Sequence, residues 1–309
     1  MNASPAIVSI GEPLIEFNRP KDGDGRTWLQ GFGGDSQNVA IAAARQGASA
    51  GYLSCVGQDW MGDAFLELWK SEGVDASKVG RHPTAPTGVS FVTHGPSGHK
   101  FDYLRKNSAA SLMSPADVPA EYIAGARFLH VSAIGQAISE TARAACDTAI
   151  AAARASGVKV SYDTNLRLRL WDLEPARATI HATIPLCDVA LPSLDDSQQL
   201  TGLSTPDEIA DFYVDLGAPM VALKMGSEGV LLAMPGRRIR VAPHKVDALD
   251  ATGAGDTFDG SFLARLLEGD DPETAARYAN VAAALSTTGY GAVTPIPRRE
   301  TVLAALRRP

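Results

Sequence analysis

Cysteine is scarce in this chain of 309 residues. The three cysteines, Cys55, Cys146 and Cys187, are odd in number and form no Cys-x-x-Cys pair. A disulfide framework and a structural zinc site are therefore not expected, and a reducing, cytoplasmic setting is the natural one. The sequence also lacks an apolar run long enough to span a membrane and a secretory signal pattern at its start, so no membrane partner is expected.

Positive charge is also in short supply. The chain carries 28 Lys and Arg residues against 35 Asp and Glu residues, which gives a formal net charge of -7. Proteins that bind nucleic acid present a basic surface, so a nucleic-acid partner is not expected. A small anionic substrate is compatible with this balance, provided that a local cationic group meets it.

Several common catalytic motifs are missing. The sequence has no Gly-x-x-x-x-Gly-Lys-[Ser/Thr] loop, no His-Glu-x-x-His, no Gly-x-Ser-x-Gly and no Cys/His cluster at metal-binding spacing. Gly31 and Gly33 are followed by Ser36 where a dinucleotide fingerprint requires a third glycine. These absences exclude a P-loop ATPase and disfavour a nicotinamide-dependent oxidoreductase.

The pattern that is present is an alternation of strands and helices. We expect strands at residues 6–10, 50–56, 88–94, 100–105, 128–132, 158–162, 188–191, 220–224, 230–234 and 238–241. We expect helices at residues 38–45, 62–71, 139–156, 175–184, 194–200, 255–267, 272–288 and 299–306. This order predicts the α/β class, with a mostly parallel sheet covered on both faces and ligands at the carboxyl ends of its strands.

One pair of strands differs from its surroundings. Gly95-Pro96-Ser97-Gly98 is a strong turn signal between two alternating segments, which predicts a β-hairpin. Phe101, Tyr103 and Arg105 follow at period two and so share one face. A fixed guanidinium on such a face suits a carboxylate.

The segment from Asp250 to Phe258, DATGAGDTF, carries the strongest chemical signal. Gly253 and Gly255 bracket a helix start, where exposed N–H groups and the helix dipole favour an anion. Asp256 lies in that first turn, where a carboxylate would compete with a bound phosphate. It fits a general base that takes a proton from a hydroxyl, and the alternative is a glycine-rich turn with a capping aspartate.

DATGAGDTF also closely resembles the carboxyl-terminal signature of the ribokinase-like (PfkB) sugar kinases. The segment Gly31–Asn38, GFGGDSQN, with the later Val56–Gly62, VGQDWMG, is similar to that family's amino-terminal signature. The resemblance implies a three-layer α/β/α fold with a small β lid. It also implies one kinase domain over residues 1–309, with the lid formed by about residues 12–32 and 86–108.

Within the amino-terminal segment, Gly33 and Gly34 would let the backbone approach a ligand closely. Asn38, which we expect at a helix start, would both cap that helix and hydrogen-bond a sugar hydroxyl. A plain turn with an N-cap is the competing interpretation.

Three further segments resemble the 2-keto-3-deoxygluconate kinases of this family, and the third and weaker of them is Leu191–Asp196. Tyr103-Leu-Arg105 with the following Lys106–Ser111 is one, and it implies that Tyr103 and Arg105 close over the substrate, with its carboxylate near Arg105. Asn165-Leu-Arg167, which runs on to Trp171, is the second. By resemblance Arg167 reaches the transferring phosphate or the sugar-acid end and Asn165 lines the cleft, whereas Arg169 is structural.

The nucleotide site is expected from the same resemblance. Lys224 and Gly226, with Gly229 and Ser193, would lie near the ATP phosphates, and Asn280 near the adenine. The alternative for Gly226 and Gly229 is a simple turn of the chain, and the alternative for Ser193 is a helix cap. The alternative for Asn280 is an exposed asparagine on a helix.

The sequence indicates metal sites less strongly than it indicates the sugar and nucleotide sites. Ser193 and Asp196 stand where many relatives carry Asn and Glu, and Asp196 could act on Mg²⁺ through water. Asp250 with Thr252 could contribute to a K⁺ site, as in some relatives.

These expectations combine into one reaction. ATP phosphorylates 2-keto-3-deoxygluconate at its 6-hydroxyl, Asp256 removes the proton, and the N–H groups of Ala254, Gly255 and Asp256 hold the phosphoryl group, with Mg²⁺ and Arg167 offsetting its charge. The alternatives are a kinase for fructose, ribose or a nucleoside, and a catalytically weak sugar-binding relative. A homodimer or higher homo-oligomer is expected by resemblance, and the preference between gluconate and galactonate epimers stays open.

Overall fold

The computed structural model describes residues 4–21, 23–95 and 98–307. Its centre is an eight-stranded sheet with the order β14-β13-β12-β11-β10-β9-β1-β4. The strands are β1 (Ile7–Ile10), β4 (Ala50–Leu53), β9 (Phe128–Ser132), β10 (Lys159–Asp163), β11 (Val189–Ala190), β12 (Val221–Lys224), β13 (Val230–Met234) and β14 (Arg237–Val241). All neighbours pair in parallel from β4 to β12, and β13 and β14 are antiparallel. The mostly parallel sheet predicted from the sequence is confirmed.

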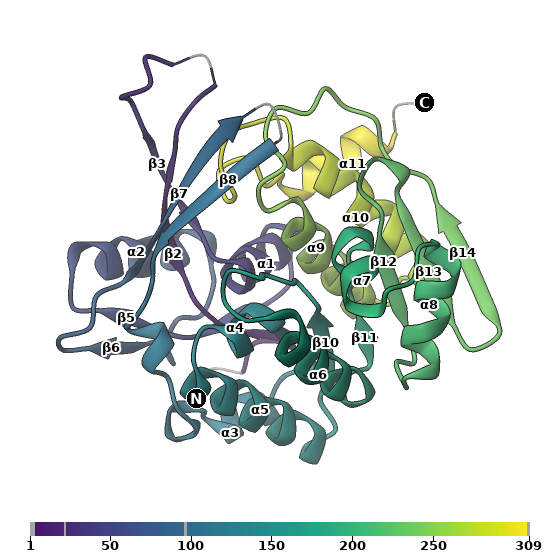
Figure 1. The fold of residues 1–309 in the computed structure, drawn as a ribbon, viewed down its shortest axis with the longest axis horizontal. Coiled ribbons are helices and arrows are strands. Elements are labelled where there is room, and N and C mark those ends of the chain that lie inside the picture. Colours follow the sequence, from purple (N-terminus) through teal and green to yellow (C-terminus); the bar gives the residue numbers. More distant parts are fainter. Residues whose placement is uncertain (1–3, 22, 96–97, 308–309) are drawn as a thin grey trace.

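Helices cover both faces of this sheet because its strands are apolar on both faces (Figure 1). Along β9, for example, Phe128 packs into one core and Leu129 and Val131 into the other. The first core is shared with α1 (Asp35–Arg45), α2 (Trp60–Glu72), α9 (Ala254–Glu268) and α10 (Pro272–Ser286). The second is shared with α3 (Ala120–Ala124), α5 (Glu140–Ala155), α6 (Leu173–Thr183), α7 (Leu194–Thr201) and α8 (Pro206–Asp215). The predicted three layers are therefore present.

A second, four-stranded sheet stands apart from the main body (Figure 1). Its order is β3-β2-β7-β8, with bounds β2 (Leu14–Asn18), β3 (Leu29–Gly33), β7 (Gly88–Gly95) and β8 (Gly98–Leu104). The hairpin of β7 and β8 was expected, and its turn residues Pro96 and Ser97 lie outside the described residues. The small separate sheet is thus present, and the lid role of residues 12–32 and 86–108 stays a prediction.

Several elements differ from the sequence expectation. The strand expected at 50–56 divides into β4 and β5 (Cys55–Gly57), and β5 pairs with β6 (Gly80–His82). The patterns above do not predict α8, α3, α4 (Ala133–Ala137) or the strands β2 and β3. The remaining elements are α11 (Arg299–Leu306) and short 3-10 helices at Ala110–Leu112, Pro115–Asp117, Ile184–Leu186 and Gly226–Glu228.

The start of α1 is the correction that matters most for the site. The helix begins at Asp35, with Gly34 as its N-cap, and not at Asn38. Gly34 has φ 106°, and a Cβ there would lie 2.2 Å from the Glu12 carbonyl oxygen, so only glycine fits this turn. Asn38 therefore lies one turn inside the helix, where its side chain cannot cap and is available to the site.

Candidate active site

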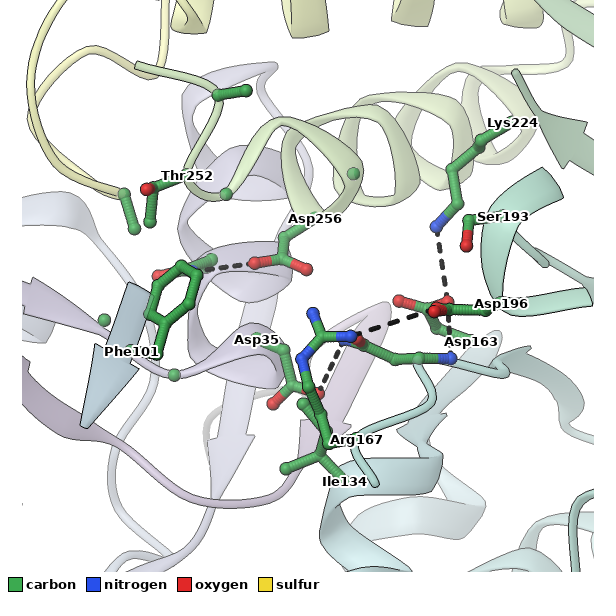
Figure 2. Close-up of a pocket in the computed structure, with 18 of the residues that line it drawn as sticks. Asp35, Phe101, Ile134, Asp163, Arg167, Ser193, Asp196, Lys224, Thr252 and Asp256 are labelled. Atoms are coloured by element: carbon green, nitrogen blue, oxygen red, sulfur yellow. Dashed lines mark hydrogen bonds and ion pairs between the residues drawn. The ribbon is translucent and has the colours of Figure 1, made fainter. Parts of the chain in front are cut away.

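A cavity of about 680 Å³ opens at the carboxyl ends of the parallel strands (Figure 2). Asp163 ends β10, Ser193 follows β11 and Lys224 ends β12. This is the edge where ligands of open α/β sheets bind. Most of the predicted site residues line this one cavity: Gly33, Gly34, Asn38, Tyr103, Arg105, Asn165, Arg167, Ser193, Asp196, Lys224, Gly226, Gly253, Gly255 and Asp256.

Asp256 lies in the first turn of α9 and is only 9% exposed. Asn38 donates from Nδ2 to its Oδ2 at 2.8 Å, which ties α9 to α1. Burial and the nearby carboxylate of Asp35 raise the pKa of Asp256 to about 7, with Asp163 adding to them and Lys224 opposing. A carboxyl with this pKa exchanges a proton near neutral pH, as a general base requires.

The amides at the start of α9 are the second part of the site. Gly253 is the N-cap, and the Thr257 amide donates to its carbonyl at 2.9 Å. The Ala254 amide donates to the Ala251 carbonyl at 3.2 Å, so it is less available than the sequence suggested. In the part of the chain that the structure describes, the amides of Gly255 and Asp256 have no protein acceptor, and both residues line the cavity.

Asp35 is a site residue that the sequence reading missed. It is the first residue of α1 and lines the cavity. Its Oδ2 accepts from Asn165 Nδ2 at 3.3 Å, and Figure 2 shows its carboxylate on the same cavity as Asp256. Burial raises its pKa, and Asp163 adds to the effect, although Ser132 and Ser36 oppose it. Asp35 lies between Gly33-Gly34 and Asn38 in the amino-terminal signature, and this position could have identified it as a site residue.

Lys224 is fixed by carboxylates rather than free. Its Nζ donates to both oxygens of Asp259 at 2.9 Å and lies 3.3 Å from Asp163 Oδ1. Burial alone would lower the pKa of Lys224, but Asp163 and Asp259 outweigh it and hold the pKa above its usual value. Lys224 therefore stays charged at the edge of the cavity.

Arg105 reaches the cavity from the loop after β8, but it already has a partner. Its guanidinium forms an ion pair with Glu12, whose side chain is fully buried and also accepts from Ser108 Oγ at 2.8 Å. The guanidinium lies 4.9 Å from the ring centre of Tyr103. Burial raises the pKa of Glu12 despite Arg105. Nε of Arg105 is buried and has no acceptor within the described residues.

Arg167 is the more accessible arginine, with 43% of its side chain exposed. Its Nη1 donates to the Leu166 carbonyl at 2.7 Å and lies 3.8 Å from Asp196 Oδ2, and Figure 2 shows its guanidinium within the cavity. Burial raises the pKa of Asp196, which also accepts from the Leu166 amide at 3.1 Å. Arg169 instead contacts the Phe101 carbonyl and lies 3.2 Å from Asp102, so it joins its loop to β8.

Four predicted residues do not line the cavity: Ala254, Gly229, Asn280 and Asp250. Asn280 is buried, and its Nδ2 donates to the Ala242 carbonyl at 3.0 Å, which fastens α10 to the end of β14. Gly229 has φ 89° and turns the chain into β13. Their expected nucleotide contacts stay predictions.

Asp250 is surrounded by protein donors. Its Oδ1 accepts from the amide and the hydroxyl of Thr252 at 3.0 and 2.7 Å, and its Oδ2 accepts from Asn18 at 2.9 Å and the Gly291 amide at 3.0 Å. Within the described residues, no group of three or more His, Cys, Asp or Glu side chains could hold a metal ion. The K⁺ site stays a prediction.

Glu16, on β2, is another carboxylate that the sequence reading missed. It lines the cavity and is 3% exposed. Burial and the nearby Asp250 raise its pKa to about 7. An isolated glutamate in an apolar strand carries no pattern that sequence reasoning could use.

No helix in the described part of the chain is both long and apolar enough to cross a membrane.

The chain matches known proteins along nearly its whole length. A model of the pfkB family of carbohydrate kinases matches residues 4–299. The 2-dehydro-3-deoxygluconokinase of Thermoproteus tenax is 35% identical over 312 residues, covering 97% of this chain and 95% of that protein. Fructokinase-1 of Oryza sativa is 32% identical over 318 residues, covering 97% of this chain and 97% of that protein. The crystal structure of Vibrio cholerae fructokinase with fructose, ADP and calcium ion has a TM-score of 0.90 at 30% identity, and the match covers 99% of this chain and 100% of that one.

Proposed function

Because the chain belongs to the PfkB family of carbohydrate kinases, we propose that it transfers the terminal phosphoryl group of ATP to the 6-hydroxyl of 2-keto-3-deoxygluconate. The products are the 6-phosphate and ADP. The observation that carries the proposal is a buried carboxylate, Asp256, beside two unpaired helix amides in a cavity that also holds Arg105 and Arg167.

Asp256 is the general base of the proposed reaction. Its carboxylate accepts the proton of the attacking hydroxyl, and Asn38 holds the carboxylate in place through its 2.8 Å hydrogen bond. The amides of Gly255 and Asp256 donate to the phosphoryl oxygens, helped by the positive end of the α9 dipole. Positioning and charge stabilisation of this kind are what phosphoryl transfer requires from a protein.

The cavity suits a nucleotide only if a cation accompanies it. Its carboxylates outnumber its cationic groups: Glu12, Glu16, Asp35, Asp163, Asp195, Asp196, Glu228 and Asp256 against Arg105, Arg167 and Lys224. Mg²⁺ carried by the ATP phosphates would supply the missing positive charge. Since no cluster of three acidic or imidazole ligands exists in the described residues, we propose that Asp196 reaches the ion through water.

The carboxylate of the sugar acid is assigned to Arg105 and Arg167. Arg105 is oriented by Glu12 and stacked on Tyr103, so one edge of its guanidinium is fixed in advance. Arg167 is more exposed, and its Nη1 contacts the Leu166 carbonyl and Asp196. The carboxylate of an acidic substrate would bind Arg105 together with Glu12. Arg167 would neutralise the negative charge that Arg105 leaves uncompensated.

A neutral sugar is the second candidate substrate, and two observations favour it. Arg105 is already neutralised by Glu12, and the fructokinases are about as similar to this chain as the sugar-acid kinase. A panel of sugar acids and neutral sugars, each with ATP and Mg²⁺ and with the phosphorylated product identified, separates the two. The proposal fails if fructose or ribose is phosphorylated efficiently while 2-keto-3-deoxygluconate is not.

The substitution Arg167→Lys tests the second arginine. We expect KM for the sugar acid to rise by roughly tenfold, because lysine keeps the charge but loses the paired donors that match a carboxylate. Arg169→Lys is the matched control, since Arg169 does not line the main cavity. Equal effects of the two substitutions in steady-state assays would remove Arg167 from the substrate site.

The pH dependence follows from the pKa of Asp256. Since the ionised form is the base, kcat/KM is expected to rise about tenfold per pH unit up to a pH of about 7 and to level off above it. Asp35 on α1, Asp163 on β10 and Lys224 on β12 face this carboxyl, and the two aspartates together outweigh the lysine. A profile that is flat between about pH 5.5 and 8 would contradict the assignment.

A further inference from the structure

Asp259 is a buried carboxylate that has no role in the reaction proposed above. It lies on α9 one turn after Asp256, and its side chain is fully buried. Both of its oxygens accept hydrogen bonds from Lys224 Nζ at 2.9 Å. The lysine side chain is itself only 12% exposed. The contact therefore joins α9 to the end of β12 by a nearly dry ion pair.

The same ammonium also faces the end of β10. Lys224 Nζ is 3.3 Å from Oδ1 of Asp163, a side chain that is 6% exposed, and Figure 2 shows Lys224 pointing toward Asp163. An ammonium has three N–H donors, so Asp259 and Asp163 together can occupy all of them. Lys224 is thus fixed from two sides by elements that are far apart in the sequence.

The position of the ammonium matters because of what lies beside it. A Cβ built on Gly255 would be 3.6 Å from Lys224 Nζ. The positive charge therefore lies next to the first turn of α9, where the unpaired amides of Gly255 and Asp256 are. Lys224 and Gly255 line the same cavity, whereas Asp259 lies behind them and does not.

Stability alone is a weak explanation for this arrangement. Two buried carboxylates around one ammonium leave an excess of negative charge, and replacing a buried ion pair by apolar groups is often neutral or stabilising. We propose that Asp259 is a positioning residue for phosphoryl transfer, because it holds the Lys224 ammonium between Asp163 and the amides of α9, facing the group being transferred. The inference rests on the proposed function for the place of that group.

The first test is the isosteric substitution Asp259→Asn. It keeps the shape of the side chain but loses the charged anchor, so Lys224 can leave its position. We expect kcat to fall by ~10–100-fold, as misplacement of a group at the reacting centre does, while KM for the sugar changes by less than about threefold. A kcat within about threefold of wild type would overturn the proposal.

A comparison of two further variants tests whether Asp259 acts through Lys224. We expect Lys224→Met to lower kcat, and the double variant Lys224→Met with Asp259→Asn to be no slower than Lys224→Met alone. A double variant that is a further tenfold slower, by an order-of-magnitude criterion, would overturn the proposal. This comparison does not need the single Asp259→Asn protein to fold, because the double variant does not leave a buried ammonium without its anchor.

A matched control separates position from stability. Arg45 and Glu72 form a 2.8 Å ion pair, with 9% and 8% of their side chains exposed, outside the main cavity. Glu72→Gln is expected to lower the unfolding temperature and leave kcat unchanged. An equal fall of kcat in Glu72→Gln and Asp259→Asn would overturn the positioning role. Failure of the wild-type protein to phosphorylate any sugar with ATP would instead count against the proposed function.

Discussion

Asp256→Asn is expected to lower turnover by ~10²–10⁴-fold, because the amide cannot take the proton of the attacking hydroxyl. The substitution preserves the shape of the site. The new side-chain oxygen can still accept the hydrogen bond from Asn38 that Asp256 accepts at 2.8 Å. Turnover at saturating ATP and sugar is the measurement, with ATP binding checked separately by calorimetry.

The same variant is expected to be more stable than the wild-type protein at pH 8. The folded state raises the pKa of Asp256 from 3.8 to about 7, so it binds the proton more tightly than the unfolded chain does. Stability from this group is therefore greatest at low pH and is lost as the pH rises from about 4 to 7. Removing the charge should raise the free energy of unfolding at pH 8 by on the order of 4 kcal/mol, measured by urea denaturation.

Asp195→Asn is the control for this pair of results, since Asp195 lines the rim of the same cavity and is exposed. It should change turnover by less than about threefold. If Asp256→Asn retains turnover within about tenfold of wild type, another group takes the proton and the assigned base is wrong.

Arg105→Met is expected to have the second largest effect. It should change both the KM for the sugar acid and the free energy of unfolding. KM for the sugar acid should rise by ~10²-fold, because losing one partner of a buried charge pair costs about 2–5 kcal/mol in binding. KM for fructose should change little. The free energy of unfolding should fall by about 3–5 kcal/mol, because Glu12 is left buried without its cation.

The double variant Glu12→Gln with Arg105→Met separates these effects. It removes the orphaned carboxylate, so much of the lost stability should return while KM for the sugar acid stays high. Steady-state kinetics and urea denaturation of both variants give the answer. An unchanged KM for the acid in either variant would show that its carboxylate binds elsewhere in the cavity.

The sequence predicted the parallel core of the fold because its strands are short apolar runs between clear helix signals. Strand β2 was missed because its alternation of apolar and polar residues, Ile15 to Asn18, is only four residues long. The helix α8 was missed although Thr205 and Glu208 form a capping box at its start. The boundary of α1 was wrong because Gly34, and not Asn38, is the N-cap.

The candidate site was predictable where residues form a compact motif. The two signatures gave Asp256, Asn38 and the glycines, which line one cavity. Glu12, Asp35 and Asp259 were missed because single carboxylates acquire a role only from partners distant in the sequence. Glu12 meets Arg105 and Asp259 meets Lys224 only after the chain has folded.

The hydrogen bond between Asn38 and Asp256 joins residues that are 218 positions apart in the chain. During synthesis the apolar face of α1 is made long before α9 arrives to cover it, and such exposed surface favours aggregation. The pairing also has a high contact order, which slows folding. A nascent or truncated chain that lacks its last quarter would therefore lack the proposed base and leave the face of α1 uncovered. The arrival of α9 would both bury that face and supply the carboxylate that the proposed reaction needs.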